Sequence, residues 1–225
     1  MTSLTQPRAI VFDVIGTLFS LESQRGRLID AGLPAHALES WFAASLRDLF
    51  ALAVTRRTAP MIKVLEDNLH HLLARHHLRQ DGPRVQAILA GMGELDVDPE
   101  AAAALDRFAS QGLTCAALSN GSQAATERLL ERGGIRMHFA EVLSIDTVGL
   151  PKPRAEVYRM MAEHLHLECG AILMIAAHPW DLHGARAAGL ATGFLSRGLP
   201  WPTSLDAPDL SEVGLDLLAR RVCAL

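Results

Sequence analysis

The sequence is poor in cysteine, and the few that it has are far apart. Cys115, Cys169 and Cys223 are the only cysteines, an odd number without a CxxC pair. This pattern excludes a disulfide framework and a zinc site built on paired thiolates. Isolated cysteines are typical of a reducing compartment. The first residues, MTSLTQPR, also lack the apolar core of a signal peptide, so we expect a cytoplasmic protein.

The chain also lacks a basic cluster and a long apolar run. Its formal net charge is -4, so nucleic acid and anionic membrane surfaces are not expected partners. No apolar stretch is long enough to span a bilayer. Hydrophobic residues nevertheless make up 49% of its 225 positions. This is enough apolar material for one α/β domain, or for a core domain with an insertion.

Short apolar runs alternate with helical patterns along most of the chain. Polar residues or glycines bound each run, as is typical of buried strands. Strands that alternate with helices predict βαβ units. We therefore expect a Rossmann-like α/β fold, a parallel sheet with helices on both faces. The predicted strands are 8–13, 113–119, 139–144, 171–177 and 191–196.

The segment 21–93 has helical periodicity and no clear strand. Its first apolar stripe comprises Leu38, Trp41, Phe42, Leu46, Leu49 and Phe50. We expect Trp41 and Phe42 to pack inside this segment rather than to line a substrate pocket. The interpretation is a helical cap inserted after the first strand, so that residues 1–20 and 94–225 form the core. Near the chain end, 209–222 is predicted to be a closing helix.

Polar residues stand where the predicted strands end. Because ligands bind at the carboxyl ends of parallel strands, these side chains are expected to meet at one edge of the sheet. They are Asp13 and Thr17 after the first strand, Ser119 and Asn120 at the end of the second, Lys152 after the third, and His178, Trp180 and Asp181 after the fourth.

These residue types suit covalent catalysis on an anionic substrate. A positioned and ionised carboxylate such as Asp13 can attack carbon or phosphorus, and a nearby lysine, here Lys152, favours the ionised form. A second carboxylate, Asp181, can orient or deprotonate water. Ser119 and the amides beside it can hold an anion where a loop enters a helix. Each residue alone also suits a turn or a helix cap, so the prediction depends on their occurrence together.

Four segments resemble the motifs of the haloacid dehalogenase superfamily, in the usual order. They are VFDVIGTLF at 11–19, LSNGS at 118–122, KPRAEVY at 152–158 and AAHPWDLHGARAAG at 176–189. Within the superfamily the chain most resembles the (S)-2-haloacid dehalogenases (haloacid dehalogenase type II). Ile15 stands where superfamily phosphatases usually carry a second Asp. Ser119 is followed by Asn and Gly, and Tyr158 lies six residues after Lys152, as in the dehalogenases.

The resemblance implies a hydrolase that needs no metal and no cofactor. Asp13 would displace halide from a short 2-haloacid with inversion and form an aspartyl ester. Water oriented by Asp181, with help from Lys152, would then hydrolyse the ester to release a 2-hydroxy acid. Thr17 would support Asp13. The implied partner is therefore a small 2-substituted carboxylic acid, and the helical caps of this family also suggest a homodimer.

The resemblance also implies a set of residues around the substrate. Those of the core are Ser119, Asn120, Tyr158, His178, Trp180 and Ile15. The family uses a cap arginine near the leaving halide, and Arg47 is the best match because it lies off the apolar stripe of its helix. Arg56 and Arg57 are alternatives.

The fourth motif departs from the dehalogenase pattern, which leaves other functions open. Ala176 and His178 stand where dehalogenases usually have Ser and Asn. His178 could replace the Asn as a hydrogen-bond donor, or act as a base near neutral pH. One alternative is a Mg²⁺-dependent phosphatase of the same superfamily, although Ile15 and Ala176 remove an acid and a metal ligand. The other alternative is a non-catalytic binding protein on this fold.

Overall fold

A six-stranded parallel sheet forms the centre of the computed structural model, which describes residues 6–225. Residues 1–5 of the predicted core segment therefore lie outside the described part. The strand order is β5-β4-β1-β6-β7-β8, and every neighbouring pair is parallel. Strand β1 (Ala9–Phe12) lies between β4 (Thr114–Ser119) and β6 (Ile172–Ala176). The predicted Rossmann-like sheet is thereby confirmed.

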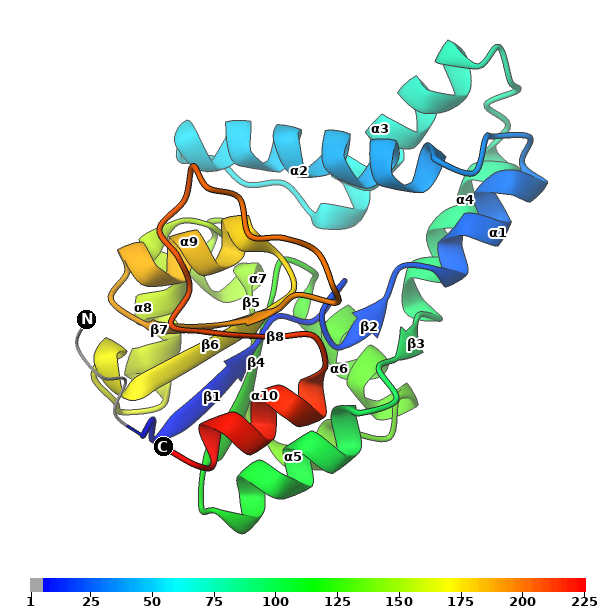
Figure 1. The fold of residues 1–225 in the computed structure, drawn as a ribbon. Coiled ribbons are helices and arrows are strands. Elements are labelled where there is room, and N and C mark those ends of the chain that lie inside the picture. The colour runs from blue at the N-terminus through cyan, green and yellow to red at the C-terminus, as the bar shows by residue number, and fades with distance from the viewer. Residues whose placement is uncertain (1–5) are drawn as a thin grey trace.

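Helices cover both faces of the sheet, which explains why its central strand is apolar throughout (Figure 1). Side chains alternate along β1. Ile10 and Phe12 pack in a core with α5 (Ala101–Ser110) and α10 (Leu215–Val222). Val11 points the opposite way, into a core with α8 (Ala155–His164) and α9 (Pro179–Ala187).

The remaining core elements are two further strands of the sheet and several short helices. They are β5 (Phe139–Ser144), β7 (Ala191–Leu195), α6 (Gln123–Arg132), α7 (Ile145–Val148) and the short 3₁₀ helices η2 (Arg136–His138) and η3 (Cys169–Ala171). The five predicted strands correspond to β1, β4, β5, β6 and β7. Among residues 6–225, no helix combines the length and the apolar character that a membrane crossing requires.

The prediction of a single closing helix over 209–222 is wrong in its first part. Strand β8 (Leu210–Glu212) extends the sheet beside β7. Asp209 fixes this segment, because its Oδ2 accepts hydrogen bonds from the N–H and the hydroxyl of Thr192, at 2.8 and 2.9 Å. Helix α10 begins only after Gly214, which is extended. A strand of three residues is too short to show an alternation of apolar and polar side chains in the sequence. Its position depends instead on the contact between Asp209 and Thr192.

Four helices lie together on one side of the sheet and form an arm (Figure 1). They are α1 (Ser23–Asp30), α2 (Ala37–Val54), α3 (Met61–Arg75) and α4 (Gly82–Ala90), followed by η1 (Gly91–Gly93). The chain enters the arm through β2 (Phe19–Ser20) and returns through β3 (Asp96–Val97), and these two strands pair antiparallel. All four helices fall within the predicted cap 21–93, whose bounds stay a prediction.

Gly184 lets α9 approach the segment that carries Lys152. A Cβ at this position would lie 2.6 Å from Pro153 Cβ, 2.8 Å from Pro153 O and 2.7 Å from Tyr158 Oη. Neither backbone nor a buried ring can move away cheaply. We therefore predict that Gly184→Ala lowers the free energy of unfolding by about 1–3 kcal/mol. Urea denaturation followed by circular dichroism measures this change.

Gly26→Ala is the matched control for this substitution. Gly26 is an exposed residue of α1, and a Cβ there meets no atom within 4 Å. Alanine at such a helical site should be neutral or stabilise the protein by up to about 1 kcal/mol. An unchanged free energy of unfolding in Gly184→Ala would contradict our description of the close contact at α9.

Candidate active site

Asp13 stands directly after β1, at the carboxyl edge of the sheet. Its N–H continues the ladder by donating to Ile175 O at 3.0 Å. The chain then turns sharply, and the N–H groups of residues 17–19 all donate to Val14 O. Gly16 has φ +86°, and a Cβ there would lie 2.4 Å from His178 Nε2. Only glycine therefore combines this backbone conformation with the close approach of the histidine.

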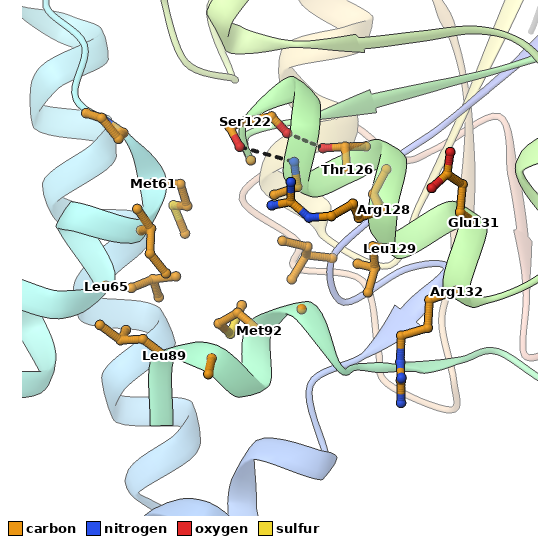
Figure 2. Close-up of a pocket in the computed structure, with 18 residues that line it drawn as sticks. Met61, Leu65, Leu89, Met92, Ser122, Thr126, Arg128, Leu129, Glu131 and Arg132 are labelled. Atoms are coloured by element: carbon orange, nitrogen blue, oxygen red, sulfur yellow. Dashed lines mark hydrogen bonds between the residues drawn. The ribbon is translucent and has the colours of Figure 1, made fainter. Parts of the chain in front are cut away.

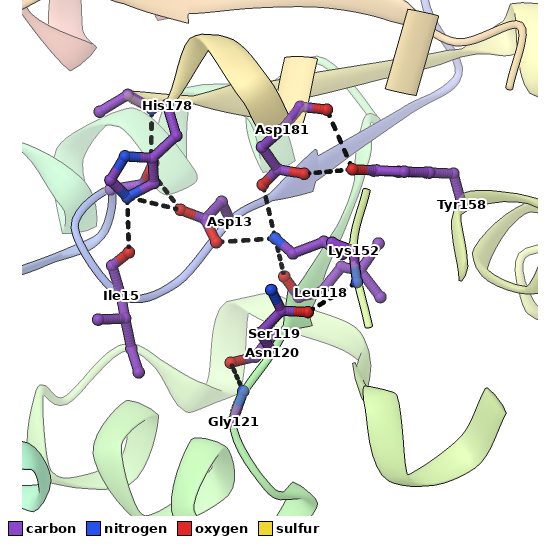
Figure 3. A network of polar contacts seen from close by, with 12 residues as sticks. Asp13, Ile15, Leu118, Ser119, Asn120, Gly121, Lys152, Tyr158, His178 and Asp181 are labelled. Atoms are coloured by element: carbon purple, nitrogen blue, oxygen red, sulfur yellow. Dashed lines mark hydrogen bonds and ion pairs between the residues drawn. The ribbon is translucent and has the colours of Figure 1, made fainter. Parts of the chain in front are cut away.

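Lys152 connects the two carboxylates of the site (Figure 3). Its Nζ donates to Asp13 Oδ1 at 2.8 Å, to Asp181 Oδ2 at 2.6 Å and to Leu118 O at 3.0 Å. The lysine and Asp181 are fully buried, and Asp13 is 5% exposed. All three ammonium protons thus have an acceptor, which a buried cation requires.

The pKa values of the two carboxyl groups are shifted in opposite directions. Burial alone would raise the pKa of Asp13, but Lys152, His178 and the hydrogen bonds from Lys152 and Thr17 together hold it below its usual value. Burial raises the pKa of Asp181 above its usual value, and the charge of Asp13 adds to this, despite the opposing charge of Lys152. Burial alone would lower the pKa of Lys152, but the two carboxylates outweigh burial and hold it above its usual value. Asp13 is therefore the stronger acid of the two and stays ionised.

Neutral side chains fix the orientation of both carboxylates. The Thr17 hydroxyl donates to Asp13 Oδ2 at 2.7 Å and accepts from the N–H of Ala177 at 2.9 Å. The Tyr158 hydroxyl lies 2.6 Å from Asp181 Oδ1 and 3.0 Å from Asp181 O. Each carboxylate thus has one oxygen on the lysine and the other on a hydroxyl, so neither can rotate freely.

The carboxyl end of β4 supplies the predicted Ser and the loop after it the predicted Asn, and both side chains accept hydrogen bonds from backbone N–H groups. Ser119 Oγ accepts from the N–H of Gly121 at 2.9 Å, and Asn120 Oδ1 accepts from the N–H of Lys152 at 2.9 Å. Asn120 therefore positions the segment of the lysine. Its Nδ2 is buried and has no hydrogen-bond partner among the described residues, and the same holds for Trp180 Nε1.

A small cavity of about 20 Å³ lies beside Asp13. This volume suits roughly one water molecule. The arm closes it with Phe42, Leu46 and Met61, and the core closes it with Asp13, Ile15, Ser119, Asn120, Gly121, His178 and Trp180. Phe42 therefore lines the pocket, and the prediction that it does not is wrong, although Phe42 also packs against the hydrophobic cluster that includes the cap residues. Trp41 does pack there, and its Nε1 donates to Leu65 O at 2.8 Å.

His178 is held between two aromatic rings at the edge of this cavity. Its ring centroid lies 5.9 Å from that of Phe42 and 5.6 Å from that of Trp180. The His178 Nε2 lies 3.1 Å from Ile15 O and 3.7 Å from Asp13 Oδ2. Because a carbonyl oxygen only accepts, the hydrogen bond to Ile15 places a proton on Nε2. At this nitrogen His178 is a donor rather than a base.

The structure does not bring Arg47 to this cluster. Its side chain is 69% exposed and pairs with Asp48 at 2.8 Å. The prediction put the apolar stripe of α2 away from the cleft and Arg47 into it. In the structure Phe42 and Leu46 of that stripe face the cavity instead. Arg47, the next residue after Leu46, is rotated by about 100° around the helix axis. Arg56, 69% exposed beside Glu156, and the exposed Arg57 also lie outside the residues that line the cavity.

Arg197 belongs to the site although the sequence did not single it out. Its guanidinium donates to Gly16 O at 2.8 Å, to Thr17 O at 2.7 Å and to Asp98 Oδ2 at 3.0 Å. Asp98 follows β3, so Arg197 joins the loop after Asp13 to the strand that returns from the arm. Its position just after β7 could have identified it from the sequence, because site residues are predicted after the other strands of the sheet as well.

Comparisons with known proteins identify the family and agree with this fold. A family model described as haloacid dehalogenase-like hydrolase matches residues 7–189. The (S)-2-haloacid dehalogenase of Pseudomonas sp. (strain YL) is 29% identical over 193 residues, which cover 84% of this chain and 83% of the relative. The (S)-2-haloacid dehalogenase 4A of Burkholderia cepacia is 27% identical, with coverage of 84% and 83%.

A solved structure matches the fold over nearly its whole length. It is that of L-2-haloacid dehalogenase from Xanthobacter autotrophicus, with a TM-score of 0.88, 24% identity, and coverage of 96% of this chain and 98% of that chain. At this identity the likeness shows the fold alone. The family model, by contrast, matches most of the sequence, and the chain accordingly belongs to the haloacid dehalogenase-like hydrolases.

Proposed function

We propose that the protein hydrolyses small 2-haloacids through an aspartyl ester on Asp13. The observation that carries the proposal is the buried Lys152 ammonium between Asp13 and Asp181, at 2.8 and 2.6 Å. The relatives that are named (S)-2-haloacid dehalogenases support the choice of substrate. In this reaction one carboxylate must be a nucleophile and the other must take a proton from water. The lowered pKa of Asp13 suits the nucleophile, and the raised pKa of Asp181 suits the base.

The first step is displacement at the carbon that carries the halogen. An ionised carboxylate oxygen of Asp13 attacks C2 opposite the carbon–halogen bond, the new C–O bond forms, and the halide departs with the bonding pair. Attack from the opposite side inverts C2. Thr17 and Lys152 fix the carboxylate, so little orientational freedom is lost when the substrate is attacked.

Buried donors beside Asp13 support binding of an anion. Asn120 Nδ2 and Trp180 Nε1 have no partner among the described residues, and both residues line the cavity. A buried donor without a partner costs about 1–3 kcal/mol, a cost that an anionic ligand would relieve. Lys152 is already engaged by two carboxylates. We therefore assign the substrate carboxylate and the departing halide to neutral N–H groups rather than to a cation.

The second step hydrolyses the ester. Asp181 takes a proton from water, whose oxygen attacks Cγ of Asp13, and the Lys152 ammonium stabilises the oxyanion that forms. When this intermediate collapses, the bond from Cγ to the substrate oxygen breaks, and that oxygen takes the proton held by Asp181 as the 2-hydroxy acid leaves. Asp13 then loses its remaining carboxyl proton to solvent and returns as a carboxylate. The net reaction consumes water and releases halide and one proton. The Asp181 pKa, raised by burial, suits this role as a base.

The residues present do not fit a Mg²⁺ site of the phosphatase type. Mg²⁺ requires a nearly complete shell of oxygen ligands, but Lys152 engages an oxygen of each carboxylate. The position of the first acidic residue in the fourth motif is Ala176, whose side chain offers no ligand. Among residues 6–225, no group of three or more His, Cys, Asp and Glu is placed to hold a metal.

We predict that Asp13→Asn lowers halide release from 2-chloropropionate by at least about a thousandfold, because the amide is not a nucleophile. The assay measures chloride from each enantiomer with EDTA present. Wild-type protein should release chloride from the (S) form only. The exposed Asp206→Asn is the matched control and should keep full activity. Undiminished release by Asp13→Asn would refute the nucleophile assignment.

A second prediction concerns the pH dependence of turnover. Burial raises the pKa of Asp181, whereas Lys152 and the hydrogen bond from Tyr158 lower it. Tyr158→Phe removes only the hydrogen bond, so the pKa of Asp181 should rise further. Because Asp181 must be ionised to act as a base, activity should be lost at a higher pH on acidification than in the wild type. Steady-state rates measured across the acid range test this shift.

The buried Met160→Leu, on the same helix as Tyr158, is the control for altered packing. It should leave the acid limb of the pH profile unchanged, because neither methionine nor leucine donates a hydrogen bond to a carboxylate. A Tyr158→Phe profile that coincides with that of the wild type would mean that Asp181 is not the base.

A further inference from the structure

A second and much larger cavity adjoins the site between the arm and the core (Figure 2). Its volume is about 780 Å³, against about 20 Å³ for the cavity at Asp13. Ile15, Met61 and Gly121 line both cavities, so the two are neighbours with these residues between them. A molecule held at Asp13 could therefore extend into the larger space past Ile15 and Met61.

The walls of the larger cavity are mainly apolar. Met61 and Leu65 come from α3, Leu89 from α4, Met92 from η1 and Leu129 from α6. Each of the five is no more than 8% exposed. Their side chains surround the space from the arm and from the core (Figure 2). An apolar group that enters would be removed from water on several sides.

Polar groups are confined to the α6 side of this cavity. Ser122, Thr126, Arg128, Glu131 and Arg132 contribute there, and all except Thr126 are exposed. From the small cavity at Asp13, the larger one thus continues along apolar walls to a polar edge at the surface of α6. Such a gradient suits an amphipathic acid whose charged end is at Asp13.

We propose that the larger cavity binds the substituent on C2 of the substrate, and that the preferred substrates are 2-haloacids with a long or bulky apolar chain. This proposal rests on the proposed function and specifies its substrate class. The 2-halo carboxylate end sits at Asp13, and an alkyl or aryl group lies between Met61, Met92 and Leu129. A methyl substituent, as in 2-chloropropionate, would leave most of this space without a ligand.

The test is a series of (S)-2-chloroalkanoates from three to ten carbons, assayed for chloride release. Each methylene placed against the apolar walls should raise kcat/KM by up to about fourfold, mainly through KM, until the chain reaches α6. Ala125→Trp provides the blocked variant, because Ala125 is an exposed α6 residue that lines the cavity. It should abolish the gain with chain length and leave the rate with 2-chloropropionate unchanged.

Ala124→Trp is the matched control, since Ala124 is the exposed neighbour on the same helix and is not among the lining residues. It should behave as the wild type with every substrate. Measurable chloride release that does not rise with chain length, or an equal loss on all substrates in Ala125→Trp, overturns the proposed subsite and leaves the proposed function standing.

Binding of unreactive acids separates the subsite from turnover. Calorimetric titration should show that decanoate binds wild-type protein at least tenfold more tightly than propionate, and that Ala125→Trp removes the difference. This result supports the subsite even if no chloroalkanoate releases chloride, in which case only the proposed function fails. Equal binding of the two acids to the wild type overturns the subsite.

Discussion

One buried ammonium between two carboxylates is the contact on which the rest of the site depends. Lys152 has no exposed surface, and its three acceptors come from β4, from the loop after β1 and from α9. Removing the lysine would leave Asp13 and Asp181 buried without a counter-charge. The free energy lost in this way is much larger than the net stabilisation that the buried ion pairs contribute. The same charge holds Asp13 ionised while burial keeps Asp181 a weaker acid.

The parallel sheet explains how residues so distant in the chain meet. The ends of β1, β4 and β6 are adjacent in the strand order, so the loops that follow them share one edge. Packing then sets the finer geometry. Gly16 and Gly184 allow close approaches that a Cβ would prevent, and Arg197 ties the loop after Asp13 to the strand that returns from the arm.

Local patterns in the sequence predict the sheet and its polar edge. Asp13 directly follows β1, Lys152 lies in the segment between α7 and α8, and Asp181 is in the first turn of α9. The failures concern relations that local patterns do not contain. Arg47 was placed in the cleft because periodicity identifies the apolar face of α2 but not what that face packs against. Phe42 was misplaced for the same reason. The large apolar cavity depends on how α3, η1 and α6 approach one another, which no single segment specifies.

The central claim is that an oxygen of Asp13, rather than water, forms the new bond to C2. It is tested most directly by a single turnover in water enriched in oxygen-18, with the protein in excess over (S)-2-chloropropionate. Mass spectrometry then follows the 2-hydroxy acid and the peptide that contains Asp13. Our account predicts unlabelled oxygen in the new hydroxyl group and one oxygen-18 in the Asp13 carboxylate. A labelled product with unlabelled Asp13 would contradict it, because water would then have attacked C2 directly.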